Sequence, residues 1–151
     1  MAELKWLIKP FKELKRDELF DMYYLRQEVF VVEQNCPYQD CDEKDKYSYH
    51  LLAYDGELLV AYLRIVEPGL SYTEASIGRV VTKFEYRGKG IGKILMIKGI
   101  DYVNSIFHRH TVRISAQQYL IPFYESLLFT TVGEGYLEDD IPHIEMIYNP
   151  K

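Results

Sequence analysis

Three glycines alternate with other residues in Arg87-Gly88-Lys89-Gly90-Ile91-Gly92, between a segment expected to form a strand and one expected to form a helix. The first turn of a helix has unpaired backbone N–H groups and about half a positive charge, so it attracts anions. Glycine lets the backbone approach phosphate oxygens because it has no Cβ. The hexapeptide therefore predicts a phosphate-binding loop, although a tight turn with solvated charges has the same spacing.

Two familiar nucleotide loops do not fit this segment. The dinucleotide fingerprint requires G-x-G-x-x-G, whereas Gly88, Gly90 and Gly92 run G-x-G-x-G. A Walker A loop ends in Gly-Lys-Ser/Thr, whereas Gly92-Lys93 is followed by Ile94. The pattern that remains is R-x-x-G-x-G, a pyrophosphate loop of another kind.

Elements that position the loop follow from hydrophobic periodicity and turn residues. Asp55-Gly56 predicts a hairpin turn, and Gly78 inside an apolar run predicts a bulge or a close backbone approach. Strands pair first in hairpins and later alternate with helices, which favours an α+β (mixed α/β) sheet. The expected strands are 4–8, 50–54, 58–65, 75–82, 111–116, 129–132 and 143–148, and the expected helices are 17–30, one from the loop to about 105, and a short one beginning near Pro122.

Length and composition limit the class of protein. A chain of 151 residues suits one domain, 1–151. The formal charge of -5 argues against a nucleic-acid partner, which needs clustered Lys and Arg. No apolar run is long enough to cross a membrane, and the short apolar patch near the N-terminus does not resemble a signal peptide. We therefore expect a cytoplasmic protein with no membrane partner.

Cys36 and Cys41 are the two cysteines of the chain. Without an export signal, reduced thiols are expected rather than a small disulfide loop. Their spacing differs from that of a zinc pair, and no second Cys/His pair follows at the usual distance. The sequence therefore predicts no metal site.

The phosphate loop resembles the R/Q-x-x-G-x-G/A signature of the GNAT N-acetyltransferase superfamily. Phe123-Tyr124 followed by Phe129 is similar to that family's F-Y-x-x-x-G-F segment, although Leu128 replaces its glycine. Segments 30–38, 77–81 and 141–144 resemble the ElaA-like branch. The resemblance covers nearly the whole chain and implies a central, mostly antiparallel sheet of about six to seven strands, splayed in the middle, with about four flanking helices.

The resemblance also implies acetyl-CoA as co-substrate. The strand that ends at Val80-Val81-Thr82 would pair with the pantetheine arm, and the amides of the loop would hold the pyrophosphate. Gln117 stands where many members have an asparagine near the pantetheine. The hydroxyl of Tyr124 would assist departure of the CoA thiolate. The expected CoA-binding residues are therefore Val80, Val81, Thr82, Arg87, Gly88, Lys89, Gly90, Ile91, Gly92, Gln117 and Tyr124.

The implied reaction is direct attack of a primary amine of a small molecule or peptide on the thioester. A base must take a proton from the amine, and a main-chain N–H near Val80 to Thr82 could stabilise the carbonyl oxygen. Glu33 is the first candidate base because it is charged within a mostly apolar run, although a solvated or salt-bridged Glu33 fits equally. His50 and His143 are further candidates, and a structural role in a strand is the alternative for each.

Arg64 and Arg79 lie in strand-like runs and could bind a substrate carboxylate. Pairing with Glu67, Glu74 or Glu33 is the alternative for both. The acidic stretch 40–45 favours a cationic amine as acceptor. Exposed tyrosines and a C-terminal strand are compatible with a homodimer interface.

Two functions fit these patterns. The first is an N-acetyltransferase, and the second is a non-catalytic acyl-CoA-binding sensor or interaction module on the same fold. The presence of Tyr124 favours the enzyme, because a sensor has no need of an acid at the thiolate.

Overall fold

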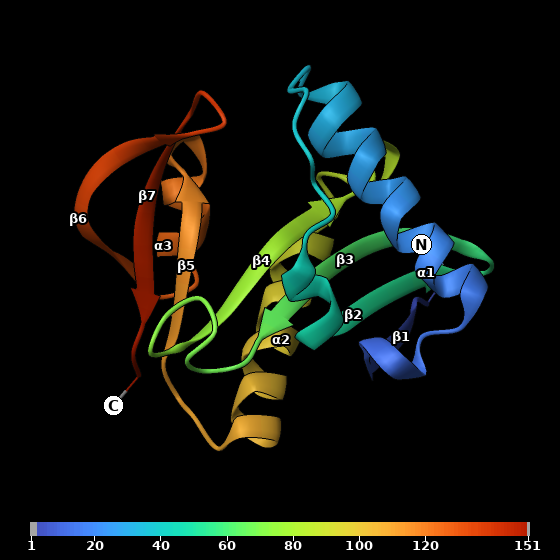
Figure 1. The fold of residues 1–151 in the computed structure, drawn as a ribbon, viewed down its shortest axis with the longest axis horizontal. Helices are drawn as coiled ribbons and strands as arrows, with labels where there is room; N and C mark the ends of the chain where they lie inside the picture. Colours follow the sequence, from blue (N-terminus) through green and yellow to red (C-terminus); the bar gives the residue numbers. More distant parts are fainter. Residues whose placement is uncertain (1–2, 151) are drawn as a thin grey trace.

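A computed structural model describes residues 3–150 of the chain (Figure 1). Its core element is a seven-stranded sheet with the order β1-β2-β3-β4-β5-β7-β6. Neighbouring strands are antiparallel except β4 and β5, which are parallel. The strands are β1 (Lys5–Pro10), β2 (Ser48–Asp55), β3 (Leu58–Val66), β4 (Ala75–Thr82), β5 (Val112–Gln117), β6 (Phe129–Glu138) and β7 (Ile141–Tyr148). The expected mixed sheet is confirmed.

The helices cover opposite faces of this sheet. Between residues 3 and 150 there are three α-helices rather than about four: α1 (Arg16–Arg26), α2 (Ile91–Phe107) and α3 (Ile121–Glu125). Leu51 of β2 packs in the cluster that contains Leu95 of α2, whereas the next residue, Leu52, packs with Met22 of α1. Successive strand residues point to opposite faces, so two apolar layers form, one under each long helix.

The first helix differs from its expected form. It begins after Lys15 rather than at Asp17, and its last α-helical residue is Arg26. The chain then continues as a π-helix over Gln27–Glu33. A π-helical segment changes which side chains face the sheet, and such segments are frequent at functional sites. This one delivers Val29, Phe30 and Glu33 to the cleft described below.

A gap in the middle of the sheet is the feature that positions the site. The ladder between β4 and β5 contains only the pairs Ala75–Val112 and Ser76–Arg113, and the strands diverge beyond them (Figure 1). On its other side β4 has a bulge, because the register with β3 slips next to Gly78 and Arg79 has φ 51. A bulge bends its strand and increases the local twist. The bulge predicted from Gly78 is confirmed.

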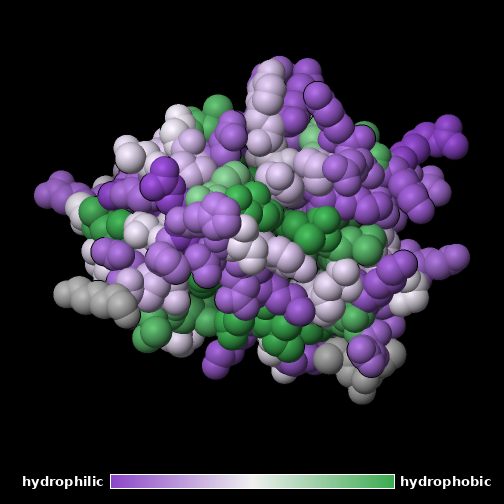
Figure 2. Space-filling model, turned by 90° about the horizontal axis from the view of Figure 1, so that it is seen from below, coloured by the Kyte–Doolittle hydropathy of each residue, from purple (hydrophilic) through white to green (hydrophobic). Residues whose placement is uncertain are grey.

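The surface seen from below relative to Figure 1 is mostly hydrophilic, with apolar patches between polar side chains (Figure 2). Charged residues make up 27% of the chain, which accounts for much of this polar cover. Across residues 3–150, no helix combines the length and the apolar character needed to cross a bilayer.

Candidate active site

A long cleft of about 550 Å³ lies in the gap between β4 and β5. Its walls come from the π-helix, the end of β4, the start of α2, the end of β5 and α3. Residues far apart in the sequence therefore meet here because the two strands diverge. The lining residues are Val29, Phe30, Glu33, Gln34, Val80, Val81, Thr82, Tyr86, Arg87, Gly88, Gly90, Ile91, Gly92, Lys93, Gln117, Tyr119, Leu120, Phe123 and Tyr124.

The glycine-rich loop forms one end of the long cleft and leads into α2. Gly88 and Gly90 have φ values of 78 and 79, and Gly90 is the N-cap of α2 with no side chain capping the helix. The first N–H groups of the helix are therefore free to bind an anion in the cleft. Every expected CoA-binding residue lines the cleft except Lys89, whose Nζ lies 5.0 Å from the centre of the Tyr86 ring.

Glu33 lies at the same end of the long cleft as the loop. Its carboxylate accepts hydrogen bonds from both terminal nitrogens of Arg87, at 2.6 and 3.1 Å. Arg87 also donates from Nε to the carbonyl oxygen of Thr82 at 3.0 Å. Glu33 is therefore salt-bridged, which was the alternative to a catalytic base. Its position favours a role in holding the phosphate loop rather than in accepting a proton from the amine.

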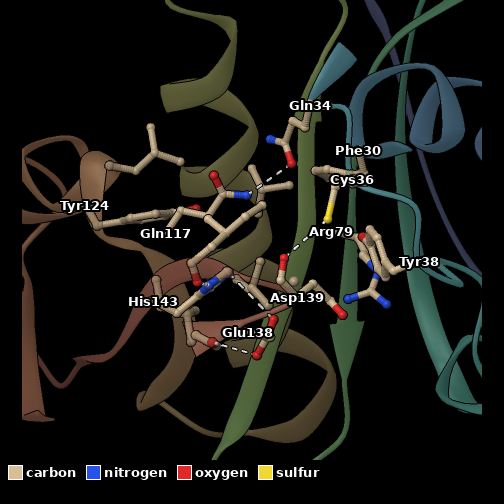
Figure 3. Close-up of a pocket in the computed structure, with 17 residues that line it drawn as sticks. Phe30, Gln34, Cys36, Tyr38, Arg79, Gln117, Tyr124, Glu138, Asp139 and His143 are labelled. Atoms are coloured by element: carbon tan, nitrogen blue, oxygen red, sulfur yellow. Dashed lines mark hydrogen bonds and ion pairs between the residues drawn. The ribbon is translucent and has the colours of Figure 1, made fainter. Parts of the chain in front are cut away.

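A small cavity of about 100 Å³ continues from the long cleft toward β6 and β7 (Figure 3). The two spaces share Phe30, Gln34, Val80, Gln117, Leu120 and Tyr124 as wall residues. Between them, the Gln117 amide nitrogen on β5 lies 3.5 Å from Oε1 of Gln34 after the π-helix. The shared wall is the place where a group held in the long cleft meets one held in the small cavity.

Tyr124 is the residue of this shared wall with acid–base chemistry. Its ring is buried against Phe123 and Phe129, with ring centres 5.1 and 5.7 Å apart in edge-on geometry. Burial raises the pKa of the Tyr124 hydroxyl, and the nearby Tyr119 adds to the effect. The hydroxyl is therefore protonated at neutral pH and can donate a proton where negative charge develops.

Arg64 and Arg79 are held by aspartates, so the expected glutamate partners were wrong. Arg64 pairs with Asp42 at 2.7 Å and Asp45 at 3.0 Å. Arg79 lies 2.8 Å from Asp40 and 3.3 Å from Asp42. The protein's own arginines thus neutralise much of the negative charge of the acidic stretch 40–45, which weakens its predicted attraction for a cationic acceptor.

Arg26 completes this ionic network from α1. It is fully buried and lies 2.7 Å from Asp40 and 2.8 Å from Asp45. Burial would raise the pKa of Asp45, but hydrogen bonds and charge from Arg26 and Arg64 lower it to about 2. The network ties segment 40–45 to the sheet and so fixes the nearby wall of the small cavity, where Tyr38 and Cys36 lie.

The two histidine candidates have different positions. His50 is fully buried in β2 and lines neither space. Its Nε2 lies 2.8 Å from the carbonyl oxygen of Asp45 and its Nδ1 2.6 Å from the Tyr62 hydroxyl. His143 of β7 lines the small cavity, as Figure 3 shows. His143 is therefore the histidine that can contact a ligand.

Several cavity residues had no signal in the sequence. Gln34, Ser115, Glu138 and Asp139 line the small cavity, and the last two follow a glycine-rich stretch of β6 that was expected to be outside a strand. Cys36 and Cys41 are both free thiols. Within residues 3–150, no three His, Cys, Asp or Glu side chains are grouped so as to hold a metal.

Comparison with known proteins agrees with this architecture. A family model described as an acetyltransferase (GNAT) domain matches residues 13–149. The chain belongs to the GNAT acetyltransferase family. Its ElaA-like character is confirmed by the protein ElaA of Escherichia coli, which is 39% identical over 95% of each chain. A UPF0039 protein of Synechocystis is 40% identical, over 97% of this chain and 96% of its own.

Solved GNAT structures share the fold closely. A crystal structure described as an acyl-CoA N-acyltransferase from Pseudomonas aeruginosa has a TM-score of 0.93 and 40% identity, covering 97% of this chain and all of its own. The crystal structure of E. coli ElaA has a TM-score of 0.91 over the same shares. The family assignment and this structure support an acyl-CoA N-acyltransferase.

Proposed function

We propose that this GNAT protein transfers an acetyl group from acetyl-CoA to a primary amine by direct attack. One observation carries the proposal: Tyr124 forms part of the wall between a long cleft with a phosphate loop and a small polar cavity. A thioester placed at this wall has room for CoA on one side and for an amine on the other.

The long cleft suits CoA in its shape and its charge. The uncapped start of α2 offers N–H groups and a positive dipole to a pyrophosphate. Gly88 and Gly90 have open space where a Cβ would stand, so the phosphate can approach the main chain. Beyond Ser76, the edge of β4 that faces β5 has no ladder partner and can pair with the amides of the pantetheine arm.

The chemistry at the shared wall needs three groups besides the thioester. A neutral amine attacks the carbonyl carbon, the C–N bond forms, and the C–S bond breaks. The bulge at Arg79 and Val80 turns main-chain N–H groups out of the ladder, where one can donate to the developing oxyanion. The Tyr124 hydroxyl, which is protonated at neutral pH, hydrogen-bonds to the departing sulfur and donates its proton as the C–S bond breaks.

The size of the small cavity favours acetyl over longer acyl groups. At about 100 Å³ it has room for an acetyl group together with the end of an amine. A medium or long acyl chain would fill the space that the acceptor needs. This size supports acetyl-CoA as the donor in the proposed reaction.

A thiol-release assay tests the proposal. The protein is mixed with acetyl-CoA or hexanoyl-CoA and a panel of primary amines, and free CoA thiol is measured together with CoA binding by calorimetry. We expect saturable CoA binding and faster thiol release with acetyl-CoA. Binding with no release for any amine would support the acyl-CoA sensor instead, and no binding at all would exclude both functions.

A further inference from the structure

The far wall of the small cavity holds a buried histidine with one free nitrogen. His143 is 6% exposed. Its Nδ1 lies 2.7 Å from the carbonyl oxygen of Ile141, which can only accept, so Nδ1 carries the proton and donates it. In the neutral ring Nε2 is then an acceptor with a lone pair. Nε2 has no hydrogen-bond donor within residues 3–150.

A carboxylate faces this free nitrogen. Oε2 of Glu138 lies 3.6 Å from Nε2 of His143, too far for a direct hydrogen bond, and the two groups point toward each other in Figure 3. Glu138 also accepts a hydrogen bond from the Ser115 hydroxyl at 3.3 Å. Nε2 of His143 and the Glu138 carboxylate are thus two acceptors that face each other. A cationic hydrogen-bond donor that contacts both atoms would stabilise this arrangement.

The charge of the cavity wall points the same way. Glu138 and the neighbouring Asp139 have no Lys or Arg partner within residues 3–150, whereas the guanidinium of Arg79 is already paired with Asp40 and Asp42. A substrate carboxylate would therefore meet two carboxylates that no Lys or Arg side chain in the described part of the chain neutralises. A positively charged group has the complementary charge for this wall.

We propose that the small cavity binds the acceptor as a primary alkylammonium, held between Nε2 of His143 and the carboxylate of Glu138, and that His143 accepts its proton. This inference rests on the proposed function and specifies its acceptor. A space of about 100 Å³ suits the narrow end of an alkyl chain, because cavities of about 150 Å³ hold a molecule the size of benzene. The class is therefore an unbranched primary amine, without a carboxylate next to the nitrogen.

The proton balance of this step is complete. The ammonium gives one proton to Nε2 of His143, which later releases it to solvent. The resulting amine attacks the acetyl carbon, and as the C–S bond breaks the nitrogen loses a second proton, which replaces the one that Tyr124 gives to the thiolate. An alkylammonium and acetyl-CoA thus yield the N-alkylacetamide, CoA thiol and one free proton.

Binding without turnover provides the first measurement. The ring ¹⁵N signals of His143 are followed in the CoA-loaded protein while butylammonium is added, with butanol as the neutral probe of equal length. We expect a saturable shift with butylammonium only, weakened at least tenfold in Glu138→Gln. Glu134→Gln, which changes an exposed carboxylate on the same strand and outside both spaces, is the matched control and should leave binding unchanged. Absence of a saturable shift, or an equal response to butanol, would overturn the inference whether or not the protein is an enzyme.

Turnover provides the second measurement. We expect Glu138→Gln to raise the KM for butylamine at least tenfold with CoA affinity unchanged. His143→Asn retains a donor for the Ile141 carbonyl and should lower kcat about 100-fold, the scale of a lost general base. If thiol release persists with both variants unaltered, the acetyltransferase proposal stands and the ammonium site is wrong. If no amine releases thiol in any variant, the proposed function fails, and the ¹⁵N titration still decides the site.

Discussion

The guanidinium of Arg87 and the carboxylate of Glu33 form a two-pronged ion pair across the mouth of the long cleft, at 2.6 and 3.1 Å. The pair joins the π-helix to the phosphate loop. It also places a negative charge beside the site expected to bind a pyrophosphate, and it occupies two of the five N–H donors of the guanidinium. Glu33 therefore competes with a phosphate for Arg87.

Glu33→Gln tests this role against that of a general base. Removing the competing charge should tighten acetyl-CoA binding up to about fivefold, since partly exposed pairs contribute about 1 kcal/mol or less. The kcat should stay within about twofold of the original value. Steady-state kinetics with both substrates varied gives the two numbers. A fall in kcat of about 100-fold at unchanged CoA affinity would instead identify Glu33 as the base.

Tyr124→Phe removes the proton donor and keeps the buried ring. Because the ring still packs against Phe123 and Phe129, we expect the fold and the CoA affinity to be retained. The kcat should fall by about 100-fold or more, as for the loss of a general acid. Calorimetric titration with CoA and the thiol-release rate measure the two effects. Unchanged turnover would remove Tyr124 from the mechanism.

Gly90→Asp should weaken CoA binding at least tenfold. The new side chain places a negative charge at the start of α2, and the φ of 79 strains any residue with a Cβ by about 1–2 kcal/mol. Gly69→Asp is the matched control, because Gly69 has φ 93 on an exposed turn outside both spaces. CoA affinity measured by calorimetry should fall only in the first variant. Equal affinities in the two variants would contradict the loop assignment.

His50 should make the fold sensitive to mild acid. Burial lowers the pKa of His50 from 6.5 to about 4. Between these two pH values the imidazole is protonated in the unfolded chain and neutral in the folded chain. Its contribution is present above pH 6.5 and is lost as the pH falls toward 4, with a full effect of about 3 kcal/mol. The lowered pKa of Asp45, about 2, acts below this range.

The measurement for His50 is the urea midpoint between pH 7 and 4.5. His50→Gln keeps an N–H for the Asp45 carbonyl but cannot take up a proton, so its midpoint should depend less on pH than that of the original protein. His110→Gln, an exposed change, is the control and should keep the original slope. Equal slopes for all three proteins would show that His50 does not titrate on unfolding.

The sequence predicted the elements whose signals are local. The apolar run of β4, the glycine in its middle and the glycines before α2 depend on neighbours along the chain, and β4 has the expected bounds, Ala75–Thr82. β6 was missed in part because Gly133 and Gly135 look like a turn, whereas they lie at a register shift inside the strand. Arg26 interrupts the apolar face of α1, and only the folded chain brings Asp40 and Asp45 to it.

The residues of the candidate site also fall into those with a local sequence signal and those that only the folded chain brings together. The glycine loop and Tyr124 belong to short motifs and could be found by spacing. The position of Glu138 opposite His143 depends on the register of β6 and β7 and on the turn between them, which no spacing rule gives. The partners of Arg64 and Arg79 likewise lie in a segment that pairs with no strand, so nearby glutamates were a wrong guess.

The short β4–β5 ladder also affects how tightly the chain holds itself together. Because the β4–β5 ladder has only two residue pairs, the two strands lack most of the hydrogen bonds that would hold them together. A ligand bound in the gap contacts both strands and replaces part of that stabilisation. Any molecule that binds the folded chain there and not the unfolded chain adds stability with the logarithm of its concentration, about 2.7 kcal/mol at 100 times its Kd. The melting temperature of this protein is therefore expected to rise with the concentration of the CoA substrate that binds in the gap.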